Sequence, residues 1–164
     1  MTLRLKEREL VAVGTSIATG CKPCTDYHIK AARAARLSDD EIRHAIKVAI
    51  SVRQNALEVM EAYGLQRPGE GVDTVGDNGW ESTRISRLVA IAAAFAVNCT
   101  TNLERHIAAA KTLGIADDEI GEITKIARFI KGMAASHVEN MIVVEELVDK
   151  AQPHPSDAGL SELT

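Results

Sequence analysis

The stretch 10–42, LVAVGTSIATGCKPCTDYHIKAARAARLSDDEI, decides the fold because the chain contains it twice. Moved by 78 positions it lies over residues 88–120, LVAIAAAFAVNCTTNLERHIAAAKTLGIADDEI. Over the wider window 9–49 against 87–127, 15 of 41 residues are identical without a gap. Unrelated helices share apolar periodicity, but not a cysteine, a histidine and an acidic turn in one register. We therefore infer an internal duplication.

Both copies have the composition of helices. Alanine, leucine, lysine, arginine and glutamate dominate, and β-branched residues recur at helical rather than alternating spacing. Ser38 and Glu41 have the spacing of a capping box, and Gly64 is a plausible helix end. We predict an all-α fold with helices over 4–19, 22–36, 39–63, 82–97, 101–113, 117–132 and 135–151.

The duplication also predicts the domain organisation. At 164 residues and 17.6 kDa, the chain suits one compact domain spanning 1–164. Within it we expect repeat 1 over about 4–64, a degenerate repeat 2 over about 81–151 and a tail at 152–164. A connector rich in glycine and proline, 65–80, joins the repeats, and Trp80 is expected to anchor it. One repeat has too few helices to cover its own apolar faces, so the two should pack together.

Charge and hydropathy exclude several kinds of partner. A net charge of −4 and an aromatic content of 3% argue against nucleic-acid binding. The longest apolar run, 88–97, has ten residues, about half of a membrane span. Charged residues near the N-terminus do not fit a secretory signal. We expect a soluble cytoplasmic protein without a nucleic-acid or membrane partner.

The two copies differ where chemistry would lie. The first has a glutamate, two cysteines and a histidine: Glu9, Cys21, Cys24 and His28. The matching positions of the second carry Arg87, Cys99, Asn102 and His106. An asparagine cannot replace a redox cysteine and an arginine cannot act as a base, so the second copy is expected to be scaffold or a wall of the site.

The spacing in the first copy suits an activated thiol. Pro23 favours the first turn of a helix, which places Cys24 near a helix N-terminus, where an anion is stabilised. His28 follows Cys24 by one turn and can take its proton or stabilise its thiolate. Glu9 lies on the preceding helix and would orient His28 if the hairpin brings the two together.

A C-x-x-C motif such as Cys21–Cys24 also occurs in haem-attachment, thioredoxin-like and zinc sites. Thr25 stands where haem attachment needs histidine, and the strands of a thioredoxin fold are missing. Two inert buried thiols remain an alternative, as does zinc. Zinc would take Cys21, Cys24 and His28, with a fourth ligand from Cys99, His106 or His44. His44 and His137 otherwise have no partner visible in sequence and are expected on helix surfaces or in packing contacts.

The pattern Glu9, eleven residues, Cys21-x-x-Cys24, three residues, His28 resembles the signature of the alkylhydroperoxidase D-like group in the carboxymuconolactone decarboxylase superfamily. The likeness continues through Gly20–Ala32 and 38–42, and covers 4–63 closely and 82–140 as a degenerate copy. It implies an all-α fold, a thiol-dependent peroxidase or disulfide-reductase activity with an antioxidant role, and homo-oligomers built from helical repeats.

The resemblance also implies roles for the four residues. Cys24 would attack the peroxide, Cys21 would resolve the sulfenic acid, His28 would deprotonate Cys24, and Glu9 would complete the proton relay. It implies no bound cofactor or metal, a peroxide or disulfide substrate, and a dithiol reductant such as a lipoylated carrier protein. A homotrimer is the assembly it suggests.

Two other function classes stay open. A non-enzymatic redox sensor or partner-regulating subunit would use oxidation of the same cysteine pair to change its assembly. A lactone decarboxylase of the same superfamily would need no dithiol, and the cysteine pair counts against it.

Overall fold

The computed structural model describes residues 2–67 and 83–142, and within these ranges the chain forms helices and no strands. The predicted all-α fold of two tandem helical repeats is confirmed. No helix in these ranges is both long and apolar enough to cross a bilayer. The helices are α1 (Leu5–Thr19), α2 (Lys22–Ala34), α3 (Asp39–Gly64), α4 (Arg84–Ala96), α5 (Thr100–Thr112) and α6 (Asp117–Glu139).

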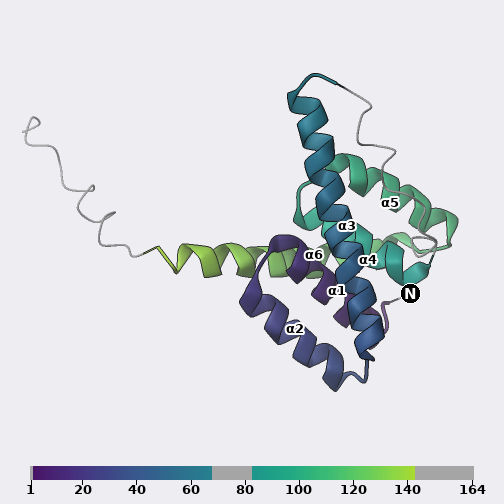
Figure 1. Ribbon diagram of the computed structural model, residues 1–164. Coiled ribbons are helices and arrows are strands. Elements are labelled where there is room, and N and C mark those ends of the chain that lie inside the picture. The colour runs from purple at the N-terminus through teal and green to yellow at the C-terminus, as the bar shows by residue number, and fades with distance from the viewer. Residues whose placement is uncertain (1, 68–82, 143–164) are drawn as a thin grey trace, which may run out of the picture.

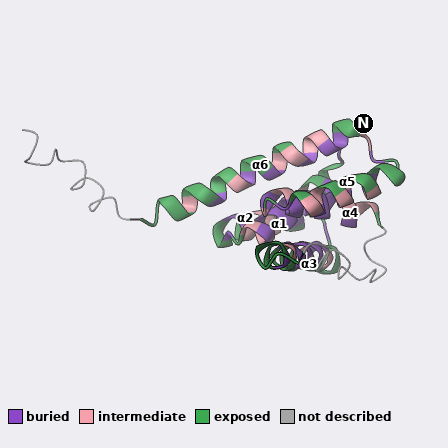
Figure 2. Ribbon diagram, turned by 90° about the horizontal axis from the view of Figure 1, so that it is seen from above, coloured by how far each residue is buried: buried purple, intermediate pink, exposed green. Residues whose placement is uncertain are grey.

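The first helix of each repeat lies at the centre of the molecule. In Figure 2, α1 and α4 lie between α3, seen end-on, and the long α6 on the opposite side. Residues from α1 to α4 form one apolar cluster, and residues of α4, α5 and α6 form a second with Leu3 and Val11. The C-terminal part of α6 passes α2 and projects from the body (Figure 1).

The backbone conformation of the turns also repeats between the two copies. Gly20 and Asn98, equivalent under the shift of 78, both end their helices in the left-handed region, with φ of 75° and 58°. Arg36 and Gly114, also equivalent, have φ of 60° and 75°. Arginine and asparagine adopt this region at a cost that glycine avoids, so the turn geometry has been kept where the residue type has not.

The acidic turn before the third helix of each repeat uses an equivalent glutamate as a cap, Glu41 in the first and Glu119 in the second. The Ser38 amide donates to Glu41 Oε2 at 2.7 Å and the Glu41 amide to Ser38 Oγ at 3.2 Å, which confirms the capping box. In the second repeat the Ala116 amide donates to Glu119 Oε2 at 3.0 Å. The alanine keeps only half of the box, because it has no side-chain acceptor.

One predicted boundary is wrong. The helices expected at 117–132 and from 135 onward are one helix, α6, which continues through Gly132 to Glu139. Glycine costs a helix roughly 1 kcal/mol relative to alanine, and the buried face of α6 outweighs this. The rest of the helix predicted to end at 151, Trp80, most of the connector and the tail lie outside the described residues.

The two repeats meet most closely where α1 crosses α4. Gly14 packs against Val89, and a Cβ added to Gly14 would lie 2.5 Å from Val89 Cγ1. Carbon atoms do not pack at that distance, so glycine is required for this approach of the two helices. Both helices are buried over most of their length.

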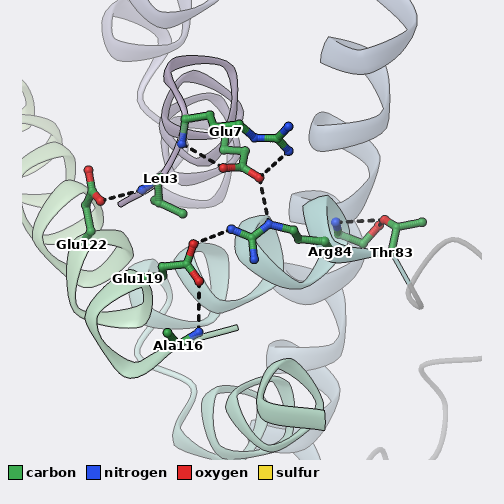
Figure 3. Close-up of polar contacts among 9 residues, drawn as sticks. Leu3, Glu7, Thr83, Arg84, Ala116, Glu119 and Glu122 are labelled. Atoms are coloured by element: carbon green, nitrogen blue, oxygen red, sulfur yellow. Dashed lines mark hydrogen bonds and ion pairs between the residues drawn. The ribbon is translucent and has the colours of Figure 1, made fainter. Parts of the chain in front are cut away.

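A network of ion pairs joins the N-terminal ends of α1 and α4. Arg84 Nε donates to Glu7 Oε1 at 2.8 Å, and Arg84 Nη2 donates to Glu119 Oε1 at 2.6 Å (Figure 3). Burial raises the pKa of Glu7, but hydrogen bonds from Arg4 and Arg84 outweigh it and lower the pKa to about 2. Arg84 therefore ties α1 and α6 to the start of α4.

Replacing Gly14 by alanine should destabilise the protein by about 1–2 kcal/mol, because overpacking costs ~1–3 kcal/mol while better helix propensity returns at most ~1 kcal/mol. Urea unfolding measures the difference. Gly132→Ala is the matched control, since nothing lies within 4 Å of its added Cβ, and it should stabilise α6. Equal gains in stability for both variants would contradict the close α1–α4 contact.

Candidate active site

The cysteine pair is held by a sharp turn between α1 and α2. Gly20 ends α1 with its amide donating to Ile17 O at 3.1 Å, and the Cys21 amide donates to Ser16 O at 3.2 Å. Cys21 is then the N-cap of α2, and its Sγ accepts from the Cys24 amide at 3.2 Å. Pro23 fits the first turn, where a missing amide hydrogen costs nothing. The pair therefore lies at the positive end of a helix dipole.

Cys21 and Cys24 form a disulfide, with their Cα atoms 5.3 Å apart. Both are buried, in a cluster with Ala12 of α1 and with Ile130 and Ala134 of α6. The predicted pair is thus brought together against a helix of the other repeat. Cys99 is a free thiol and is buried, as expected for a small apolar side chain.

A pocket of about 420 Å³ opens beside the pair. Of the two cysteines, Cys24 lines it and Cys21 does not. Tyr27 and Phe129 are 69% and 68% exposed, so the pocket reaches the surface. Its walls come from the start of α2 and the end of α6: Pro23, Cys24, Tyr27, His28, Phe129, Ile130, Met133 and His137.

His28 lies beside the predicted carboxylate. Its Nδ1 is 3.9 Å from Glu9 Oε2, and both side chains are largely buried. Among the described residues, the buried His28 Nδ1 has no hydrogen-bond partner. Burial lowers the pKa of His28, and burial raises the pKa of Glu9 against the charge of Arg8. A neutral imidazole next to a carboxylate, in the same pocket as Cys24, can accept a thiol proton.

His137 is a site residue that sequence reasoning missed. One of its ring nitrogens and both cysteine sulfurs lie within 4.8 Å of one another. It reaches them because α6 is continuous, so that Ile130, Ala134 and His137, spaced by four and three residues, share one face. The spacing of Ile130, Ala134 and His137 could have predicted this shared face. It was missed because one helix is predicted to end at 132 and another to begin at 135.

The zinc ligand set weighed as an alternative is not assembled among the described residues. Within 2–67 and 83–142, the one group of three metal-ligating side chains is Cys21, Cys24 and His137, without His28. Two of the three candidate fourth ligands make other contacts: His44 Nε2 lies 2.8 Å from Ser86 Oγ, and His106 pairs with Arg87. Sulfurs joined in a disulfide offer no thiolate to zinc, so this set exists only in the reduced protein.

In the second repeat the matching positions form a buried structural contact. Arg87 Nη1 donates to His106 Nδ1 at 3.0 Å, and Asn102 Nδ2 donates to Val52 O at 3.4 Å. Burial, with the charges of Arg105 and Arg87, lowers the pKa of His106 to about 4. His106 is therefore neutral, with its proton on Nε2, because Nδ1 accepts from Arg87.

Fold and site together define an all-helical protein of two tandem repeats with a cysteine pair in the first. A family model described as the carboxymuconolactone decarboxylase family matches residues 2–64 and 81–139, one segment on each repeat. The chain belongs to the carboxymuconolactone decarboxylase family. Searches of curated proteins and of solved structures each gave no match.

The neutral, buried His106 predicts a pH dependence of stability. Its pKa is about 4 folded against 6.5 unfolded, so the unfolded chain binds the proton more readily. Stability is then full above about pH 6.5 and falls by on the order of 3 kcal/mol as the pH drops to 4. Urea unfolding across this range should show the loss, and His106→Gln should remove most of it, leaving a smaller slope from His28.

Glu7 provides an internal control for that experiment. Because its pKa is lowered to about 2 from 4.5, its contribution is lost only below pH 4.5. Below about pH 3, where His106 is protonated in the folded and the unfolded protein alike, wild type and His106→Gln should lose stability in parallel. Parallel curves over the whole range from pH 7 to 4 would mean that His106 is not held neutral by its surroundings.

Proposed function

We propose that the protein is a thiol-dependent peroxidase or disulfide reductase whose redox centre is the Cys21–Cys24 pair, with an antioxidant role. The observation that carries the proposal is the position of Cys24 in the wall of a surface pocket, bonded to Cys21 and beside His28 with Glu9 behind it. Membership of a family that includes enzymes supports it.

The first step uses the reduced pair. His28, neutral because burial lowers its pKa, accepts the proton of the Cys24 thiol, and Glu9 stabilises the resulting imidazolium. The Cys24 thiolate attacks the terminal oxygen of a hydroperoxide, the O–O bond breaks, and the alkoxide takes the proton held by His28 and leaves as an alcohol. Cys24 is oxidised to the sulfenic acid by two electrons and the peroxide is reduced by two.

The second step closes the disulfide. Cys21 attacks the sulfur of the Cys24 sulfenic acid, the S–O bond breaks, and water leaves with the Cys21 proton. An external dithiol then returns two electrons by thiol–disulfide exchange. Because Cys24 faces the pocket, exchange at Cys24 releases the Cys21 thiolate, and the Cys24 amide already donates to that sulfur.

The two other function classes differ from this one in ways that can be tested. A lactone decarboxylase has no step that needs a dithiol. A redox sensor would use the same disulfide, but it would change state once without turning over.

The deciding experiment is peroxide-dependent turnover with reduced lipoamide as electron donor. We expect wild type to turn over and both Cys24→Ser and Cys21→Ser to lose turnover by at least about 100-fold, since each removes a sulfur that the cycle needs. A sulfenic-acid probe should label Cys21→Ser and not Cys24→Ser. Cys99→Ser is the matched control and should keep wild-type turnover.

The remaining outcomes identify the alternatives. Wild type without turnover but with rapidly alkylated, metal-free thiols would indicate a sensor. Slow alkylation together with stoichiometric zinc would indicate a metal site. Lactone decarboxylation unchanged in Cys24→Ser would indicate a non-redox enzyme.

We further propose that residues 1–164 form one domain and that the domain assembles as a homotrimer in the cytoplasm. The shared α1–α4 core supports the single domain. Exposed apolar side chains on the second half of α6 and just after it, namely Phe129, Val138, Met141 and Ile142, support assembly. Native mass spectrometry should give three times the 17.6 kDa chain mass, and a monomer at micromolar concentration would contradict it.

A further inference from the structure

We propose that His137, contributed by α6 of the second repeat, is the positive partner of the Cys24 thiolate in the reduced protein. The inference rests on the proposed function, because it assigns a role in the same thiol chemistry. It is carried by one juxtaposition: an imidazole nitrogen within 4.8 Å of both sulfurs, in the wall of the pocket that Cys24 lines.

Two histidines face this pocket, and the structure gives them different environments. His28 contacts Glu9 at 3.9 Å, and burial lowers its pKa, so it suits the role of a neutral base. His137 comes from α6, is only partly buried, and makes no ion pair with a carboxylate among the described residues. The Glu9 contact therefore gives His28 the role of the base and leaves His137 for the role of charge partner.

The reduced pair needs such a partner. A thiolate buried among Ala12, Ile130 and Ala134 loses most of its hydration, which raises the cost of its charge. The N-terminus of α2 offsets part of that cost with partial charges, and the Cys24 amide is directed at Cys21 rather than at Cys24. A full positive charge within 4.8 Å of the Cys24 sulfur offsets more, because the apolar surroundings screen it little.

The position of His137 is a product of packing. Ala134 and Ile130, one and two turns before His137 on α6, pack on the cysteines and set how close the helix lies to them. His137 follows on the same face of α6 and lines the pocket. The first repeat thus supplies the thiols and the base, and the second repeat supplies the counter-charge.

The test is the pH dependence of Cys24 alkylation in reduced Cys21→Ser protein, followed by peptide mapping with iodoacetamide. The titratable groups around Cys24 are His28 and Tyr27 from α2, Glu9 of α1 behind His28, and His137 from α6. We expect His137→Gln to move the thiol inflection upward by about one pH unit and to slow alkylation at neutral pH about tenfold. His137→Lys should restore most of the rate by returning a positive charge.

Two controls keep the result specific. His44 does not line the cysteine pocket, and its Nε2 lies 2.8 Å from Ser86 Oγ. The variant His44→Gln should therefore leave the pH inflection of Cys24 alkylation unchanged. Circular dichroism and melting temperature should show that each variant is folded. An inflection that is the same in wild type, His137→Gln and His137→Lys would overturn the proposal. So would stoichiometric zinc that only His137 variants lose, because His137 would then be a metal ligand.

Alkylation needs no turnover, so the two proposals fail separately. A shifted inflection in a protein without peroxidase or reductase turnover would overturn the proposed function and keep the thiolate–imidazolium pair. Turnover by wild type together with an unshifted inflection would keep the proposed function and overturn the thiolate–imidazolium pair.

Discussion

The close contact of α1 with α4 at Gly14 and Val89 is the constraint on which the rest of the structure depends. The two helices are the first helices of their repeats, and their crossing sets how one repeat lies against the other. Helix α1 also packs on α6. The turn after α1 therefore places Cys21 and Cys24 against the face of α6 that includes Ile130 and Ala134. The pocket beside Cys24 is therefore a consequence of how the repeats meet.

The duplication has kept geometry and changed chemistry. Cys21 and Cys99 are both N-caps with nearly the same backbone angles, yet only Cys21 has a partner cysteine one turn on. At the position of the Glu9 carboxylate the second repeat has Arg87, which donates to His106 and helps to hold it neutral. Glu119 keeps the capping role of Glu41 and adds a buried ion pair with Arg84. One repeat is thus specialised for reactive groups and the other for buried contacts that position them.

The sequence predicted most of the fold, because its evidence was local or repeated. Helical spacing and the Ser38–Glu41 cap involve residues close together in the chain, so the sequence alone can reveal them. The duplication is visible because its residues repeat at a constant shift of 78. The contact of Glu9 with His28 was expected only if the hairpin brought the two together, and in the structure the two side chains are 3.9 Å apart. His137 could not be placed in the same way, because its approach to the cysteines depends on the crossing of α6 over α2 and on a helix that continues through Gly132. The partnership of Glu7, Arg84 and Glu119 is likewise set by tertiary packing among three helices.

The division of the pocket between the two repeats has a consequence for biosynthesis. The thiols leave the ribosome within a local helix–turn–helix, but α6 follows roughly 90 residues later, which at ~5–20 residues per second is on the order of 5 to 20 s. During that interval the cysteines have their N-terminal helix dipole but not the apolar cover of Ile130 and Ala134. The nascent chain therefore exposes a dithiol to the oxidants and thiols of its surroundings before the pocket that will govern its access exists.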